Sequence, residues 1–74
     1  MENKKYYYEF GIMPSEDIDD AYSLYFELDF ELDTNNVYES CNVMLEKGLL
    51  DSSEAVDCGY IMPSSKTEYD WFKK

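Results

Sequence analysis

The sequence predicts a small α+β domain in which helices pack on one face of a three-stranded sheet, in the order β-α-β-α-β-α. Stretches rich in aromatic and β-branched residues, which are typical of strands, alternate with segments that open on helix N-cap residues. The 74 residues are enough for one domain with a thin core, and 18% of them are aromatic. We therefore expect residues 1–74 to form a single compact acidic domain.

The first strand is expected over residues 5–13, which are dense in aromatic side chains. Ser15 is then suited to be a helix N-cap, and the carboxylates of Glu16 and Asp17 would interact favourably with the helix dipole. These signals predict a short helix over residues 15–23.

Residues 24–33 allow two interpretations. Apolar and acidic residues alternate without exception from Phe26 to Asp33, which is typical of a half-buried strand. The alternative is a single long helix over residues 15–33, but that helix would carry Asp29 within its apolar stripe. We prefer the strand, which would bury one set of side chains and expose the other. The buried set is Phe26, Leu28, Phe30 and Leu32, and the exposed set is Glu27, Asp29, Glu31 and Asp33.

The second half of the chain carries clearer helix signals. Asn36 and Glu39 have the spacing of a capping box, and Gly48 is a natural residue to follow the end of that helix. A third strand is expected over residues 55–62. Ser65 then begins a short C-terminal helix.

Negative charge is the most distinctive feature of the composition. Seventeen Asp and Glu residues stand against six Lys, and the net charge of −11 exceeds the magnitude of about 2–8 that keeps a small domain soluble. No basic residue lies between Lys5 and Lys47. Direct binding to nucleic acid or to an anionic membrane is disfavoured, because both attract basic surfaces. We predict that eight carboxylates form a partner-binding surface: Glu16, Asp17, Asp19, Asp20, Glu27, Asp29, Glu31 and Asp33.

The sequence carries no pattern that predicts catalysis, a metal site or a cofactor. Histidine, the commonest general base, is absent. A calcium loop read from Asp29 has Thr34 in place of the invariant Gly and Ser40 in place of the bidentate Glu. Cys41 and Cys58 are expected to be buried packing residues. We therefore expect a binding protein that is not an enzyme and needs no cofactor.

Two classes of function are favoured over a third, minor interpretation, a small homo-oligomeric structural protein. The first is a nucleic-acid mimic that occupies the basic groove of a DNA- or RNA-handling enzyme, because carboxylates on one strand face repeat at roughly 6.6 Å, comparable to the separation of neighbouring phosphates. Small size and acidity resemble the general style of phage and mobile-element proteins that block restriction, CRISPR or repair enzymes. The second is an adaptor or regulatory protein that binds a host protein through exposed aromatic residues. We expect a cytoplasmic location, because no apolar run reaches the length of a spanning helix and no signal-peptide core follows the N-terminus.

Overall fold

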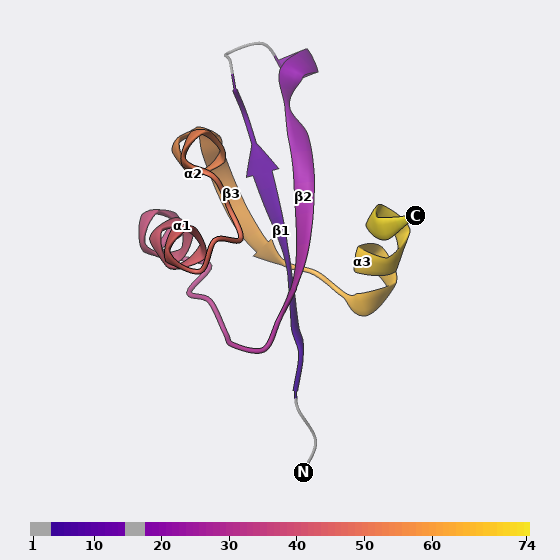
Figure 1. Ribbon diagram of the computed structural model, residues 1–74. Helices are drawn as coiled ribbons and strands as arrows, with labels where there is room; N and C mark the ends of the chain where they lie inside the picture. The colour runs from indigo at the N-terminus through magenta and orange to yellow at the C-terminus, as the bar shows by residue number, and fades with distance from the viewer. Residues whose placement is uncertain (1–3, 15–17) are drawn as a thin grey trace.

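Three antiparallel strands form the centre of the fold, in the order β2-β1-β3 (Figure 1). The computed structural model describes residues 4–14 and 18–74. The elements in chain order are β1 (Tyr6–Ile12), the 3-10 helix η1 (Ile18–Asp20), β2 (Tyr22–Leu28), α1 (Val37–Glu46), α2 (Ser52–Asp57), β3 (Cys58–Pro63) and α3 (Lys66–Lys73). This architecture confirms the predicted α+β class.

The central strand, β1, sets the register of the sheet. Tyr8 lies opposite Phe26 of β2, and Phe10 lies opposite Ile61 of β3. Because side chains alternate along a strand, the even-numbered residues of β1 all face the core. Phe10 and Ile12 are fully buried there, and Met44 of α1 packs against them in the same core.

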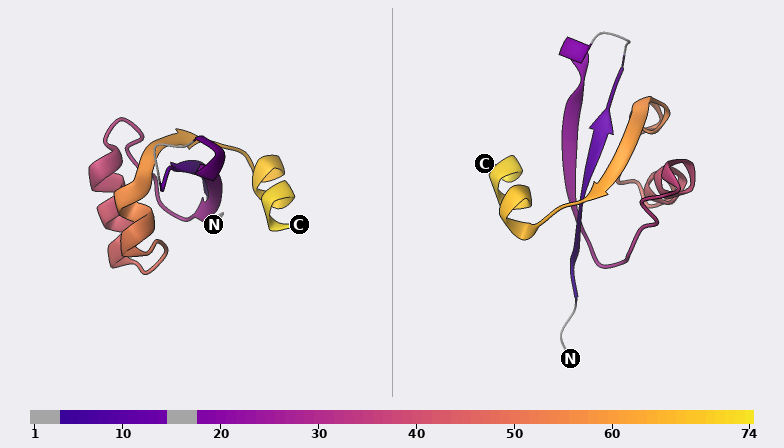
Figure 2. Two further views of the ribbon diagram at one scale, coloured as in Figure 1. Left: turned by 90° about the horizontal axis from the view of Figure 1, so that it is seen from above. Right: turned by 180° about the vertical axis from the view of Figure 1, so that it is seen from behind.

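Helices lie on both sides of this sheet. The predicted packing on one face holds for α1 and α2, which lie together on the core side (Figure 2). The third helix, α3, lies on the other side, where the ring of Tyr69 is 5.7 Å from that of Tyr7 and the ring of Phe72 is 5.3 Å from that of Tyr25. None of the helices in the described segments is long and apolar enough to cross a membrane.

The helix signals around α1 and α3 are found where the sequence placed them. The side chain of Asn36 accepts a hydrogen bond from the backbone N–H of Glu39, and Ser65 does the same for Glu68 at the start of α3. Gly48 adopts a φ of 73°, and its N–H donates to the carbonyl of Leu45, which closes the last turn of α1.

The predictions for residues 15–33 need correction. Residues 15–17 lie outside the described part, and the expected helix over 15–23 is reduced to η1. The strand expected over 24–33 is β2, which begins at Tyr22 and ends at Leu28. It ends there because Leu28 pairs with Tyr6, the first residue of β1, so no strand remains for the following residues to pair with. The presence of β2 also excludes a single helix over 15–33.

The strand expected over 55–62 also begins later than predicted. Residues 52–57 form α2, and β3 runs from Cys58 to Pro63. The helix forms because Asp51 and Glu54 make a capping box in which each accepts a hydrogen bond from the other's backbone N–H. The apolar pair Ala55 and Val56 therefore lies in a helical turn.

Candidate functional site

Six of the eight carboxylates predicted to bind a partner lie in the described residues, and they are found at two different ends of β2. Asp19 and Asp20 are exposed in η1, just before β2, whereas Glu27 lies near the end of β2. The two ends of β2 are about 20 Å apart, six steps of ~3.3 Å from Tyr22 to Leu28. Asp29, Glu31 and Asp33 follow β2 and are also exposed. Glu16 and Asp17 lie outside the described residues.

The three carboxylates that follow β2, Asp29, Glu31 and Asp33, are called the acidic loop. Its centre is held by the hydroxyl of Tyr8, which accepts a hydrogen bond from Leu32 N at 2.9 Å and donates to Leu32 O at 3.5 Å. Leu32 is buried, as predicted. The side chains of Glu31 and Asp33 therefore project from a fixed point of the backbone.

The end of the acidic loop is joined to the start of α1. The carboxylate of Asp33 accepts a hydrogen bond from Asn35 N at 3.0 Å. The carbonyl oxygen of Asp33 accepts from Asn36 N at 3.1 Å and from Ser40 Oγ at 2.8 Å. This turn positions Asp33 firmly, but it also removes the regular strand geometry on which the phosphate-like spacing depended.

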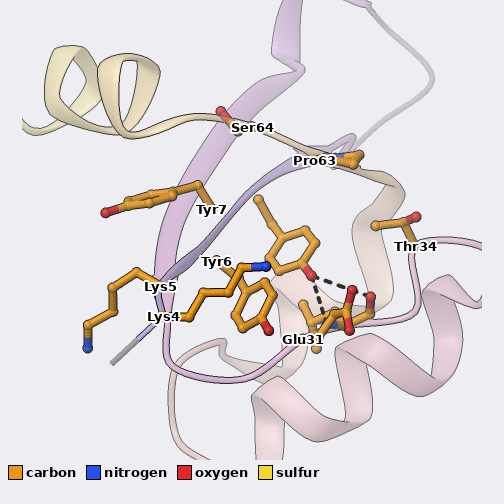
Figure 3. Close-up of a pocket in the computed structure, with 10 residues that line it drawn as sticks. Lys4, Lys5, Tyr6, Tyr7, Glu31, Thr34, Pro63 and Ser64 are labelled. Atoms are coloured by element: carbon orange, nitrogen blue, oxygen red, sulfur yellow. Dashed lines mark hydrogen bonds between the residues drawn. The ribbon is translucent and has the colours of Figure 1, made fainter. Parts of the chain in front are cut away.

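Cations accompany the carboxylates at this end of the sheet. Glu31 lines a pocket of about 370 Å³ together with Lys4 and Lys5 (Figure 3). The ammonium of Lys47 lies 4.7 Å from the centre of the Phe30 ring, which is half-buried and not part of the main core. Three of the six lysines therefore lie near the acidic loop, Lys4 and Lys5 beside Glu31 and Lys47 over Phe30.

Glu27 differs from the acidic loop because it lies within β2, on the face that α3 covers. Its carboxylate accepts a hydrogen bond from the hydroxyl of Tyr7 at 2.7 Å. Lys66 lies nearby: its pKa is raised mainly by its hydrogen bond to Asp70, and Glu27 adds to this shift. Glu27 is therefore in a mixed electrostatic environment.

A second cluster of carboxylates forms at the opposite end of the sheet, and we call it the acidic end. Ile12 pairs with Tyr22 on one side and with Cys58 on the other, so β2 and β3 both begin at this end. The N–H of Met13 donates to the carbonyl of Asp57 at 2.8 Å, which joins α2 to the same region. The acidic end consists of Asp51, Glu54 and Asp57 around Tyr22, while Asp19 and Asp20 lie in η1, directly before β2.

The pKa of Tyr22 reflects the negative charges around its side chain. Its side chain is 45% exposed, and its pKa is raised by partial burial and by repulsion from Glu54, Asp51 and Asp57. In the described segments, no lysine lies within ion-pair distance of these three carboxylates; the ion pair that does form joins Lys66 to Asp70 in α3. The acidic end is therefore an exposed aromatic side chain beside three carboxylates, Asp51, Glu54 and Asp57, that form no ion pair with a lysine of the described residues.

Hydrogen bonds at the start of α2 hold the carboxylate of Asp51 in place and favour its ionised form. Asp51 accepts hydrogen bonds from Glu54 N at 2.8 Å and from Ser53 Oγ at 2.9 Å, and both lower the pKa of Asp51. Glu54 in turn accepts from Asp51 N at 3.2 Å. The carboxylate of Asp51 stays ionised at neutral pH because these donors stabilise its charged form.

The binding surface predicted from the sequence does not include Asp51, Glu54 or Asp57. A signal for two of them exists, because Asp51 and Glu54 have the spacing of a capping box. Their proximity to Tyr22 has no local signal, since it depends on the pairing of strands that are far apart in the sequence.

Trp71 and Phe72 behave differently from each other. Phe72 contacts Tyr25 and docks α3 on the sheet, whereas Trp71 is 69% exposed.

Among the described residues, no group of three or more Cys, Asp or Glu side chains is arranged to hold a metal ion. Comparison with protein-family models, curated proteins and solved structures finds no match to the chain.

Proposed function

We propose that this protein is a non-catalytic, nucleic-acid-mimicking inhibitor that occupies the basic groove of a DNA- or RNA-handling enzyme. The observation that carries the proposal is the acidic end, where Tyr22 is exposed among Asp51, Glu54 and Asp57. The acidic loop is a second contact at the other end of β2. Restriction, CRISPR and repair enzymes are the kinds of partner that the proposal includes, and it places the protein in the cytoplasm, where such enzymes act.

The chemistry of the acidic end suits arginine and lysine side chains. A guanidinium group binds carboxylates through paired hydrogen bonds and stacks on aromatic rings. Tyr22 offers a ring, and the three carboxylates around it offer acceptors. Proteins that track a nucleic-acid backbone present these basic side chains toward phosphates.

The size and charge of the molecule also support mimicry. Its principal extents are 45 × 26 × 21 Å. One strand of a nucleic-acid duplex carries a negative charge every ~3.4 Å along the helix axis, so 45 Å of duplex would present about 13 charges on one strand. The net charge of −11 is of the same order. A basic groove would therefore meet a similar charge density in this protein.

Two matched variants test where the partner binds. The first removes three charges from the acidic end: Asp51→Asn, Glu54→Gln and Asp57→Asn. The second removes three from the acidic loop: Asp29→Asn, Glu31→Gln and Asp33→Asn. Asn remains a good N-cap and Gln a capping-box partner, so the first variant keeps its helix. Both variants have the same net charge.

The partner is captured on immobilised protein from a host-cell lysate at low salt and identified by mass spectrometry. Its affinity for the wild type and for both variants is then measured with purified components at 0.15 and 0.5 M NaCl. We expect an enzyme that binds nucleic acid, displacement of its DNA or RNA by the protein, and a steep loss of affinity in 0.5 M NaCl. The acidic-end variant should bind more weakly than the acidic-loop variant. A partner that binds both variants as tightly as the wild type, or keeps its nucleic acid when the protein binds, contradicts the proposal.

An adaptor that binds a host protein through aromatic residues is the second candidate, and the exposure of Trp71 favours it. Tryptophan is enriched at the centres of interfaces. In that case Trp71→Ala should abolish capture of the partner, while the acidic-end variant and 0.5 M NaCl should leave capture unchanged. The same set of measurements thus separates the two functions.

A further inference from the structure

A groove between α1 and α2 brings the two cysteines of the chain together. It has a volume of about 610 Å³, and its lining is mostly apolar, with Val37, Leu45 and Val56 among its residues. Cys41 comes from the middle of α1, and Cys58 is the first residue of β3, directly after α2. Both thiols line this groove.

The two thiols are free and close enough to affect each other. Burial raises the pKa of both; their mutual interaction partly offsets this rise for Cys41 and adds to it for Cys58, whose pKa reaches about 12. Their accessibility differs, since Cys41 is 3% exposed and Cys58 is only half-buried. A reagent that enters the groove therefore meets Cys58 first.

We propose that Cys41 and Cys58 are an oxidation site at which a low-molecular-weight disulfide, such as oxidised glutathione, converts the thiol pair into an intrachain disulfide. The bond would join the middle of α1 to the start of β3 across the floor of the groove. The inference rests on the groove that both thiols line, and it does not depend on the proposed function.

The reaction proceeds by two exchanges. The thiolate of Cys58 attacks one sulfur of oxidised glutathione, the glutathione S–S bond breaks, and one glutathione thiolate leaves. The thiolate of Cys41 then attacks the Cys58 sulfur of this mixed disulfide and expels the second glutathione. The protein loses two electrons and two protons, and oxidised glutathione becomes two molecules of glutathione. Because burial keeps both thiols largely protonated, the reaction should be slow, on the order of hours.

Intact-mass spectrometry tests this directly. Folded protein is incubated with excess oxidised glutathione, the remaining thiols are alkylated, and circular dichroism verifies that the fold is retained. We expect the wild type to lose the mass of two hydrogens, to take up no alkylating reagent and to stay monomeric. The oxidised form should also melt at a higher temperature, because a crosslink restricts the unfolded chain.

Single-cysteine variants show the order of the exchanges. Cys41→Ala should stop at the mixed disulfide and retain one glutathione on Cys58, whereas Cys58→Ala should leave Cys41 unmodified in the folded protein. The proposal is overturned if the folded wild type keeps both thiols, accumulates a stable glutathione adduct or forms intermolecular dimers. It is also overturned if the intrachain disulfide forms only in urea.

Discussion

Removing the hydroxyl of Tyr8 should release the acidic loop and lower the free energy of unfolding. Tyr8→Phe leaves the ring in the core but deletes the group that accepts from Leu32 N at 2.9 Å and donates to Leu32 O. Tyr8 and Leu32 are both buried, so water does not freely replace the bond. Leaving a buried N–H without a partner costs about 1–3 kcal/mol. A loss of about 2 kcal/mol should lower the melting temperature of a domain this small by roughly 8–16 °C.

Tyr7→Phe is the matched control, because it makes the same chemical change one residue away on the opposite face of β1. The hydroxyl of Tyr7 donates to Glu27 at 2.7 Å in an exposed position, and its loss should change the free energy of unfolding by less than about 0.5 kcal/mol. Both variants are measured by urea unfolding monitored by circular dichroism. If Tyr8→Phe costs no more than Tyr7→Phe, the bond to Leu32 does not hold the loop.

Three further results are expected. Gly11→Ala should destabilise the sheet markedly, because a Cβ there would overlap the ring of Tyr60. Gly59→Ala should lower stability only slightly, since its Cβ would meet only the flexible end of Met13 at 2.9 Å. Thermal melts compare the two variants. Phe10→Ala should cost about 3–5 kcal/mol in urea unfolding, and Phe30→Ala clearly less, because Phe10 is fully buried and Phe30 is half-buried. Stability should be retained up to about pH 10, the ordinary pKa of tyrosine, and fall above it. Above that pH the unfolded chain loses the tyrosine protons while the raised pKa values keep them on the folded protein, so stability declines until the pH has passed the raised values. Melting temperatures between pH 8 and 11.5 test this for the tyrosines concerned, Tyr7, Tyr22 and Tyr25.

The parts of the fold that the sequence predicted well are those with local causes. The helix after Asn36 needs only its own cap and Gly48, and both signals lie within a few residues of the helix ends. The alternation from Phe26 to Asp33 is an equally strong local signal, yet only its first three residues lie in β2. Alternation reports which side chains could share a face, but a strand also needs a partner. The partner, β1, begins at Tyr6, and this limit is not visible within the alternating segment.

The candidate site was harder to predict because it depends on distant pairings. Asp19 and Asp57 belong to the same end of the sheet because Ile12 pairs with the start of β2 and with the start of β3. The exposed positions of Glu27, Asp29, Glu31 and Asp33 followed from the alternation and are confirmed. These four residues do not form a single regular row, because the chain bends at Asp29 and Phe30.

Asp57 offers the clearest distinction between charges that serve folding and charges that serve binding. Asp51 and Glu54 cap α2, but the carboxylate of Asp57 makes no hydrogen bond or ion pair with the described residues. It lies at the last position of α2, where the helix dipole disfavours a negative charge, and three residues from the like charge of Glu54. Asp57→Asn should therefore stabilise the fold by about 0.3–1 kcal/mol, whereas Asp29→Asn, which removes the same charge from an exposed bend, should have a smaller effect. Urea unfolding of the two variants decides this. If Asp57→Asn is destabilising, Asp57 contributes to the fold; if it stabilises the fold while weakening the partner complex, the protein retains a charge at the acidic end that folding alone disfavours.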